Sequence, residues 1–209
     1  MSLYNKASLI QVPSLYKDGL LVSTVPEDRS GDFAVARGAN LSATRIGEDG
    51  YIKKGYENLL LQSNSFDTTW AGNVTLTSGQ SGYDGSNDAW LLNVISGNLR
   101  QSISLSGVIV TSVYIKKGTA NGFRLRINAA TDFNLYIDLV ANDIYSHDGI
   151  SAKMESVGSG WYRVQIAANV SSLTEISFYT TDGATTPTSE TIYIQDAQLN
   201  QGLVAYPYL

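Results

Sequence analysis

Alternation of apolar and polar residues at every second position is the feature that most constrains the fold of this chain. The clearest run is residues 133–139, FNLYIDL, in which every odd-numbered position is apolar. Successive side chains of a β-strand point to opposite faces, so this spacing predicts a strand with one buried and one wet face. Residues 123–127 and 162–166 alternate in the same way, which places Arg124 and Arg126 on the wet face.

The same period of two predicts further strands along the body of the chain. These are residues 73–77, 89–95, 101–105, 108–116, 175–179 and 191–199. Turn dipeptides such as Asn121-Gly122, Asp148-Gly149 and Asp182-Gly183 punctuate the body, and no sustained helical period appears. About nine short strands at this spacing predict an all-β fold, an antiparallel β-sandwich of the jelly-roll type.

The first part of the chain has a different pattern. Pro13 and Pro26 interrupt short apolar pieces, and residues 33–54 contain the turn residues Gly38, Gly47 and Gly50. We therefore expect two domains: residues 1–57 as an extended N-terminal anchoring arm with a short β cap, and residues 58–209 as the sandwich. Because an arm with little core of its own needs a surface to order it, we expect a partner or sister subunit to supply one.

Composition excludes several kinds of chemistry. Among 209 residues there is no cysteine, which rules out disulfides, thiolate metal sites and cysteine nucleophiles. No apolar run approaches the roughly 20 residues of a membrane helix, and the N-terminus lacks the layout of a signal peptide. We expect no membrane insertion.

The distribution of charge argues against a nucleic-acid partner. Residues 1–60 carry seven Lys or Arg and seven Asp or Glu, whereas residues 61–209 carry seven and twelve, so the net charge of −5 lies on the body. Nucleic-acid affinity depends on neutralising phosphates with basic side chains. An acidic body without a basic cluster is therefore a poor polyanion binder.

Two longer phrases and several short motifs between them stand out along the chain. They are FAVARGANLSATRIGEDGYI at 33–52, NLLLQSNSFDTTW at 58–70, YDG at 83–85, AWLL at 89–92, VYIKKG at 113–118, GWYR at 160–163 and IYIQDAQLNQGLVAYPYL at 192–209. In their order and spacing they resemble a module of virion-surface, tail-fibre and head-fibre proteins of tailed bacteriophages. The body between the two phrases looks like a jelly roll related in fold to carbohydrate-binding modules.

The resemblance implies a virion structural protein at the virion surface, made in the host cytoplasm. Its partners would be other virion proteins of the capsid or tail. Proteins with this module are usually homotrimers, and their N-terminal part anchors them to the particle. Because 209 residues leave no room for a long shaft, we expect a short head fibre or capsid decoration protein whose jelly roll is a candidate binder of host-surface glycan. A tail-associated receptor-binding protein and a free carbohydrate-binding module are the alternatives, and the sequence leaves the host, the receptor and the oligomeric state open.

The candidate glycan-binding residues are Tyr83, Trp90 and Tyr136, since flat aromatic faces with nearby polar groups suit amphipathic ligands. Packing is the competing interpretation, because Trp90 stands beside Leu91 and Trp161 opens an alternating strand. We expect the second interpretation to hold for most tryptophans of the chain.

No catalytic residue, cofactor or metal ligand is assigned. His147 lies between Ser146 and Asp148, but neighbours in one turn cannot generally arrange themselves as a catalytic triad. Asp84 and Asp88 are a weak calcium candidate in the run DGSND, which lacks the spacing of an EF-hand. We therefore expect a protein that is not an enzyme.

Overall fold

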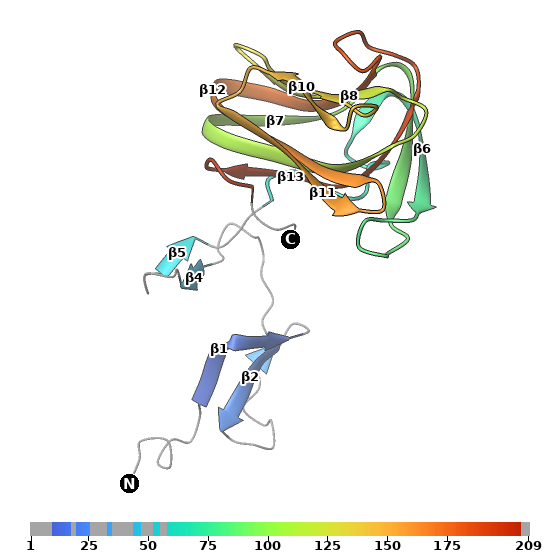
Figure 1. The fold of residues 1–209 in the computed structure, drawn as a ribbon. Helices are drawn as coiled ribbons and strands as arrows, with labels where there is room; N and C mark the ends of the chain where they lie inside the picture. Colours follow the sequence, from blue (N-terminus) through green and yellow to red (C-terminus); the bar gives the residue numbers. More distant parts are fainter. Residues whose placement is uncertain are drawn as a thin grey trace. The chain divides into compact units, whose positions relative to one another are not determined.

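A computed structural model describes residues 10–17, 20–25, 33–34, 44–46, 52–54 and 58–205, and every element among these residues is a β-strand (Figure 1). The chain divides into two compact units, Met1–Gly55 and Tyr56–Leu209, which are described separately. The prediction of an all-β fold is confirmed. The division of functions at residue 57 stays a prediction.

The first unit contains two small antiparallel sheets. One has three strands in the order β1 (Ile10–Lys17), β2 (Leu20–Val25) and β3 (Phe33–Ala34), and the other pairs β4 (Thr44–Ile46) with β5 (Ile52–Lys54). The described part of the expected extended arm is thus paired into a sheet. The β1–β2 register is irregular between Gln11 and Tyr16, a stretch that includes Pro13, and proline has no N–H to donate.

The second unit is built from eight strands that share one hydrogen-bonded network. The order is β10-β9-β8-β12-β7-β13, with β11 paired to β12 and β6 paired to β7. The strands are β6 (Ala71–Gln80), β7 (Ala89–Lys117), β8 (Gly122–Ala129), β9 (Phe133–Asp138), β10 (Asp143–His147), β11 (Ser151–Gly158), β12 (Trp161–Thr181) and β13 (Thr191–Gln201).

Two long strands, β7 and β12, pass from one layer of the sandwich to the other (Figure 1). Residues 161–170 of β12 pair with residues 107–116 of β7 and with β11, in what we call the first layer. Residues 173–178 of β12 pair with residues 99–105 of β7 on one side, and residues 173–181 pair with β8 on the other. β8 pairs with β9, and β9 with β10, in the second layer. The register shifts between Val170 and Leu173, where β12 crosses.

The strand β13 completes the first layer by lying between two segments of β7. Ile192 is opposite both Leu92 and Lys117, and Ile194 is opposite both Trp90 and Ile115. Sequence periodicity predicts three separate strands where β7 is continuous, because residues 96–98 and 106–107 look like turns; in the structure the chain bends there without ending the strand.

The main hydrophobic core lies between the layers, and its members range from Leu60 to Leu199. Leu135 and Ile137 are buried whereas Tyr136 and Asp138 are only partly buried, which confirms the alternation predicted for this strand. An aromatic group fills one part of the core: the rings of Trp70 and Phe178 stack 5.1 Å apart. Within the described residues, no helix is long and apolar enough to span a membrane.

Candidate functional site

Three side chains on the outer face of the second layer form the candidate site. Tyr179 of β12 is opposite Arg124 of β8, and Arg124 is opposite Tyr136 of β9. The residues on either side of Arg124, Phe123 and Leu125, are fully buried in the core, so alternation directs Arg124 outward. We call Tyr179, Arg124 and Tyr136 the arginine–tyrosine row.

The guanidinium of Arg124 lies between the two rings of the row. Its central carbon is 4.7 Å from the ring centroid of Tyr179 and 5.4 Å from that of Tyr136. A cation within about 6 Å of a tyrosine face is attracted by the electrons of the ring. All three side chains are partly buried, so the row is supported by the sheet and still open to solvent.

Hydrogen bonds fix the direction of this guanidinium. Nε and Nη2 of Arg124 both donate to Oδ1 of Asn134, at 2.8 and 2.6 Å. Asn134 is held by Asp148, which accepts hydrogen bonds from its backbone N–H and from its Nδ2. The position of Arg124 is therefore set by a chain of contacts that ends on a loop after β10.

The Tyr179 hydroxyl is held from the other side of the row. Its oxygen accepts hydrogen bonds from Nδ2 of Asn98 at 2.7 Å and from Nη1 of Arg126 at 3.3 Å. Burial raises the pKa of Tyr179, but the hydrogen bonds from Arg126 and Asn98 and the charge of Arg126 outweigh it, and the net pKa is below the ordinary value. Arg126 is in turn paired with Asp132.

Two aromatic faces beside fixed donors on an open sheet are suited to a ligand with apolar and polar faces. Aromatic rings supply contact area, and arginine supplies planar, directed donors. The described residues place no group of three or more His, Cys, Asp or Glu close enough to hold a metal ion.

The three predicted glycan-binding residues lie in three different places. Tyr136 belongs to the row. Tyr83 lies in the loop before β7, stacked on Tyr114 with centroids 3.7 Å apart and planes within 2°. Trp90 is only 9% exposed, meets the Phe66 ring edge-on at 6.3 Å and donates from Nε1 to the Asn64 carbonyl at 3.0 Å. Trp90 therefore packs in the core, as the competing interpretation expects.

The surroundings of Tyr83 explain its position. Its hydroxyl donates to Oδ2 of Asp196 at 3.0 Å, and its backbone N–H donates to Oε1 of Gln195 at the same distance. Burial raises the pKa of Tyr83 well above the ordinary value, and the neighbouring Tyr114 and the negative charge of Asp196 raise it further. These contacts attach the loop to β13.

Asp84 and Asp88, the calcium candidates, converge on Ser86. Oδ1 of Asp84 accepts from the hydroxyl of Ser86 at 2.7 Å and from its backbone N–H at 3.0 Å, and these bonds lower the pKa of Asp84. Oδ1 of Asp88 accepts from Oγ of Ser86 and, at 2.7 Å, from Nε2 of Gln195. The carboxylates thus have protein donors, and calcium at this loop stays a prediction.

The adjacent Ser146, His147 and Asp148 do not form a catalytic arrangement. All three side chains are exposed, and the carboxylate of Asp148 accepts hydrogen bonds from Asn134. His147 ends β10, where its backbone is opposite Leu135.

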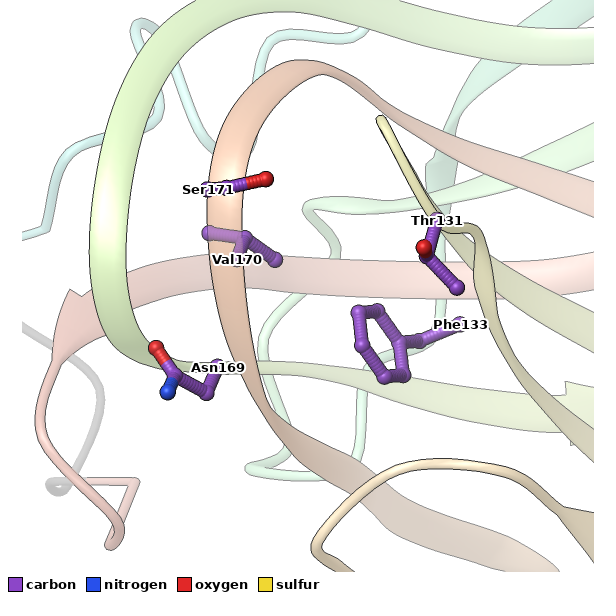
Figure 2. A pocket seen from close by; sticks show the side chains of 5 residues that line it. All are labelled: Thr131, Phe133, Asn169, Val170 and Ser171. Atoms are coloured by element: carbon purple, nitrogen blue, oxygen red, sulfur yellow. The ribbon is translucent and has the colours of Figure 1, made fainter.

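A separate pocket of about 250 Å³ lies where β12 leaves the first layer. Figure 2 shows Thr131 and Phe133 on one side, and Val170 and Ser171 on the other; Asn169 completes the lining. None of these side chains titrates between pH 2 and 12, so the pocket offers no acid or base. Sequence reasoning did not identify it, because its residues come from a turn and a crossing.

No protein-family model matches the sequence, and no curated protein matches it. Solved structures similar in part to this chain include three with a bound oligosaccharide. The CBM22-1–GH10 modules of endo-1,4-beta-D-xylanase 10B from Clostridium thermocellum, with xylohexaose, match with 16% identity and a TM-score of 0.41 over 72% of this chain and 28% of that chain. TmCBM61 with beta-1,4-galactotriose matches with 12% identity and a TM-score of 0.37 over 70% of this chain and 100% of that chain. CsCBM6-3 from Clostridium stercorarium with cellobiose matches with 12% identity and a TM-score of 0.33 over 68% of this chain and 92% of that chain.

This chain spans less than a third of the length of the xylanase chain. The identities and TM-scores of the three structures are too low to assign a family or a ligand. Evidence for the fold therefore comes from the strand pairing of this chain itself.

Proposed function

We propose that this protein is a non-enzymatic β-sandwich that binds glycan through the arginine–tyrosine row. The observation that carries the proposal is the guanidinium of Arg124, held between the rings of Tyr136 and Tyr179 on an open sheet face. A sugar ring has apolar C–H faces that suit an aromatic side chain and hydroxyls that suit fixed donors. Arg124 and Tyr179 have side-chain hydrogen bonds, whereas the Tyr136 side chain has none among the described residues, so its loss tests binding with the least risk to the fold.

Binding is tested by isothermal titration calorimetry with a panel of bacterial-surface oligosaccharides. Tyr136→Ala should weaken binding about two- to tenfold, the loss expected for one aromatic contact of about 0.5 to 1.5 kcal/mol. Tyr193→Ala is the matched control, because Tyr193 is a partly buried tyrosine on β13 in the first layer. A panel without any binder, or a Tyr136→Ala variant with unchanged affinity, contradicts the proposal.

We further propose that the protein is a virion component of a tailed bacteriophage, a short head fibre or capsid decoration protein at the virion surface. Support comes from the phrases at residues 33–52 and 192–209 and from the order of the motifs between them. Residues 1–57 would contact other virion proteins and associate three copies of the chain. Weak single sites would suffice for adhesion, because many copies on one particle raise avidity by roughly 10² to 10⁴.

Light scattering on the full chain and on residues 58–209 tests the assembly. A trimer that is lost on truncation supports anchoring through residues 1–57. A monomer in both forms contradicts the trimer and favours either a decoration protein ordered only by the capsid or the second candidate, a free carbohydrate-binding module, which the same row supports equally well. A tail-associated receptor-binding protein differs only in its position, which electron microscopy of labelled particles would give.

A further inference from the structure

In the described part of the chain, three arginines lie on the outer face of the second layer, and two of them have an acidic partner. Arg126 pairs with Asp132, and Nε of Arg100 lies 3.3 Å from a carboxylate oxygen of Glu175. Arg124, on β8 between Tyr179 of β12 and Tyr136 of β9, has no carboxylate within ion-pair distance among the described residues. Its hydrogen-bond acceptor is instead the neutral amide of Asn134.

The unpaired cation lies on an acidic body. Residues 61–209 carry twelve acidic and seven basic side chains, so carboxylates are available to the fold. Asp148 is close enough to bind Asn134, yet it contacts the amide and not the guanidinium. The arrangement therefore holds Arg124 in one orientation and leaves its charge without a counter-ion.

The direction of the guanidinium leaves specific donors to a ligand. Nε and Nη2 of Arg124 are used by Asn134, whereas Nη1 has no hydrogen-bond partner among the described residues. The Tyr136 hydroxyl, next to it in the row, has none either. A ligand at the row could therefore accept hydrogen bonds from one charged donor, Nη1 of Arg124, and from one neutral donor, the hydroxyl of Tyr136.

We infer that the sugar recognised by the arginine–tyrosine row is anionic, a uronic-acid or similar acidic residue whose negative group pairs with Arg124. The inference depends on the proposed glycan binding and specifies its ligand class. Hydrogen bonds between arginine and a carboxylate are shorter and about twice as strong as neutral ones. A neutral sugar that covered the row would leave a partly desolvated cation without a counter-charge, which is unfavourable.

The test compares acidic oligosaccharides with their own neutral methyl esters, in which a methyl group on each carboxylate removes the negative charge. The probes are galacturonate, glucuronate and sialate oligomers, each as acid and as methyl ester, together with one sulfated oligosaccharide, in calorimetry at 50 and 500 mM NaCl. At least one acid should bind tenfold or more tightly than its ester, and its affinity should fall at the higher salt concentration. Sole preference for the sulfated probe would keep the anionic class and overturn the carboxylate.

Three variants locate the effect. Arg124→Gln should lower the affinity for the acid about tenfold or more and that for the ester by a clearly smaller factor, and Arg124→Lys should give an intermediate loss for the acid, because it keeps the charge but not the planar fork. Arg100→Gln is the matched control, since it removes an arginine from the same face that already has an acidic partner. Thermal unfolding of each variant checks that it is folded. If Arg124→Gln does not fold, the affinities of Arg124→Lys for acid and ester provide the test.

The outcomes separate the two proposals. Equal affinity for acid and ester, with binding weakened in Tyr136→Ala, overturns the anionic ligand and leaves glycan binding intact. Affinity that is unchanged in both Tyr136→Ala and Arg124→Gln, or a panel without any binder, overturns both.

Discussion

At the scale of single residues, Gln195 joins the loop of residues 81–88 to the first layer. Its side chain is fully buried; Oε1 accepts from the backbone N–H of Tyr83, and Nε2 donates to Asp88 at 2.7 Å. Weaker contacts of 3.3 Å reach Asp84 and Ser86. One amide therefore satisfies polar groups from a whole loop, which is why a glutamine stands where alternation alone would accept many side chains.

Gln195→Ala should lower the free energy of unfolding by about 1 to 3 kcal/mol, because it leaves the Tyr83 N–H and the Asp88 carboxylate without this partner. Urea denaturation followed by tryptophan fluorescence measures the change. The control is Gln201→Ala at the exposed end of β13. An equal loss in both variants contradicts the role given to Gln195.

Tyr83 should make the stability of the folded protein depend on pH in the alkaline range. Burial, Tyr114 and Asp196 raise its pKa above the ordinary value of about 10, so the folded state keeps the phenol proton longer than the unfolded state. The stabilisation is complete below about pH 10 and is lost as the pH rises further. Urea midpoints between pH 8 and 11 should fall more steeply for the wild type than for Tyr83→Phe; parallel curves contradict this.

At the scale of the elements, β7 and β12 define the sandwich because each contributes to both layers. Gly107 marks the crossing of β7: it is opposite Val170 and has φ of +105°, a conformation that side chains disfavour. A Cβ at this position would have no neighbour within 4 Å, so the constraint comes from the backbone alone. The bend that separates the layers thus requires glycine for conformational reasons.

Gly107→Ala should therefore cost about 1 to 3 kcal/mol of unfolding free energy through backbone strain, without any steric clash. Chemical denaturation gives the value, with the exposed neighbour Ser106→Ala as reference. A variant as stable as the reference would show that the crossing tolerates other conformations.

Sequence periodicity predicts best those strands that have one buried face. β8 and β9 are found because Leu125, Ile127 and Ile137 are buried at alternate positions. β10 and β11 were missed because they are edge strands that are largely exposed. Alternation also directs Arg124 and Tyr136 outward, but their adjacency to Tyr179 depends on which strands pair, and pairing is a long-range property that local pattern does not contain.

At the scale of the whole molecule, the main core belongs to the second unit, because all its members fall between Leu59 and Leu199. Residues 56–209 therefore contain by themselves the apolar side chains of the main core, and the burial of such side chains drives folding.

Residues 56–209 should fold without the first unit and unfold in one cooperative transition, measurable by near-ultraviolet circular dichroism in urea. Residues 1–190 are the informative comparison, because this truncation removes β13 and the core residues Ile192, Ile194 and Leu199. We expect no cooperative transition for it. A cooperative transition in residues 1–190, or none in residues 56–209, contradicts this assignment of the core.

The position of β13 between two segments of β7 has a consequence for biosynthesis. Both segments of β7 leave the ribosome long before residues 191–201 do, and until then the edges that β13 will occupy have no partner. The nascent chain must therefore keep a gap in its sheet open through most of its translation, and premature termination yields a product with two unpaired strand edges. Synthesis of the last strand therefore removes these two unpaired edges, each of which could otherwise pair with another chain.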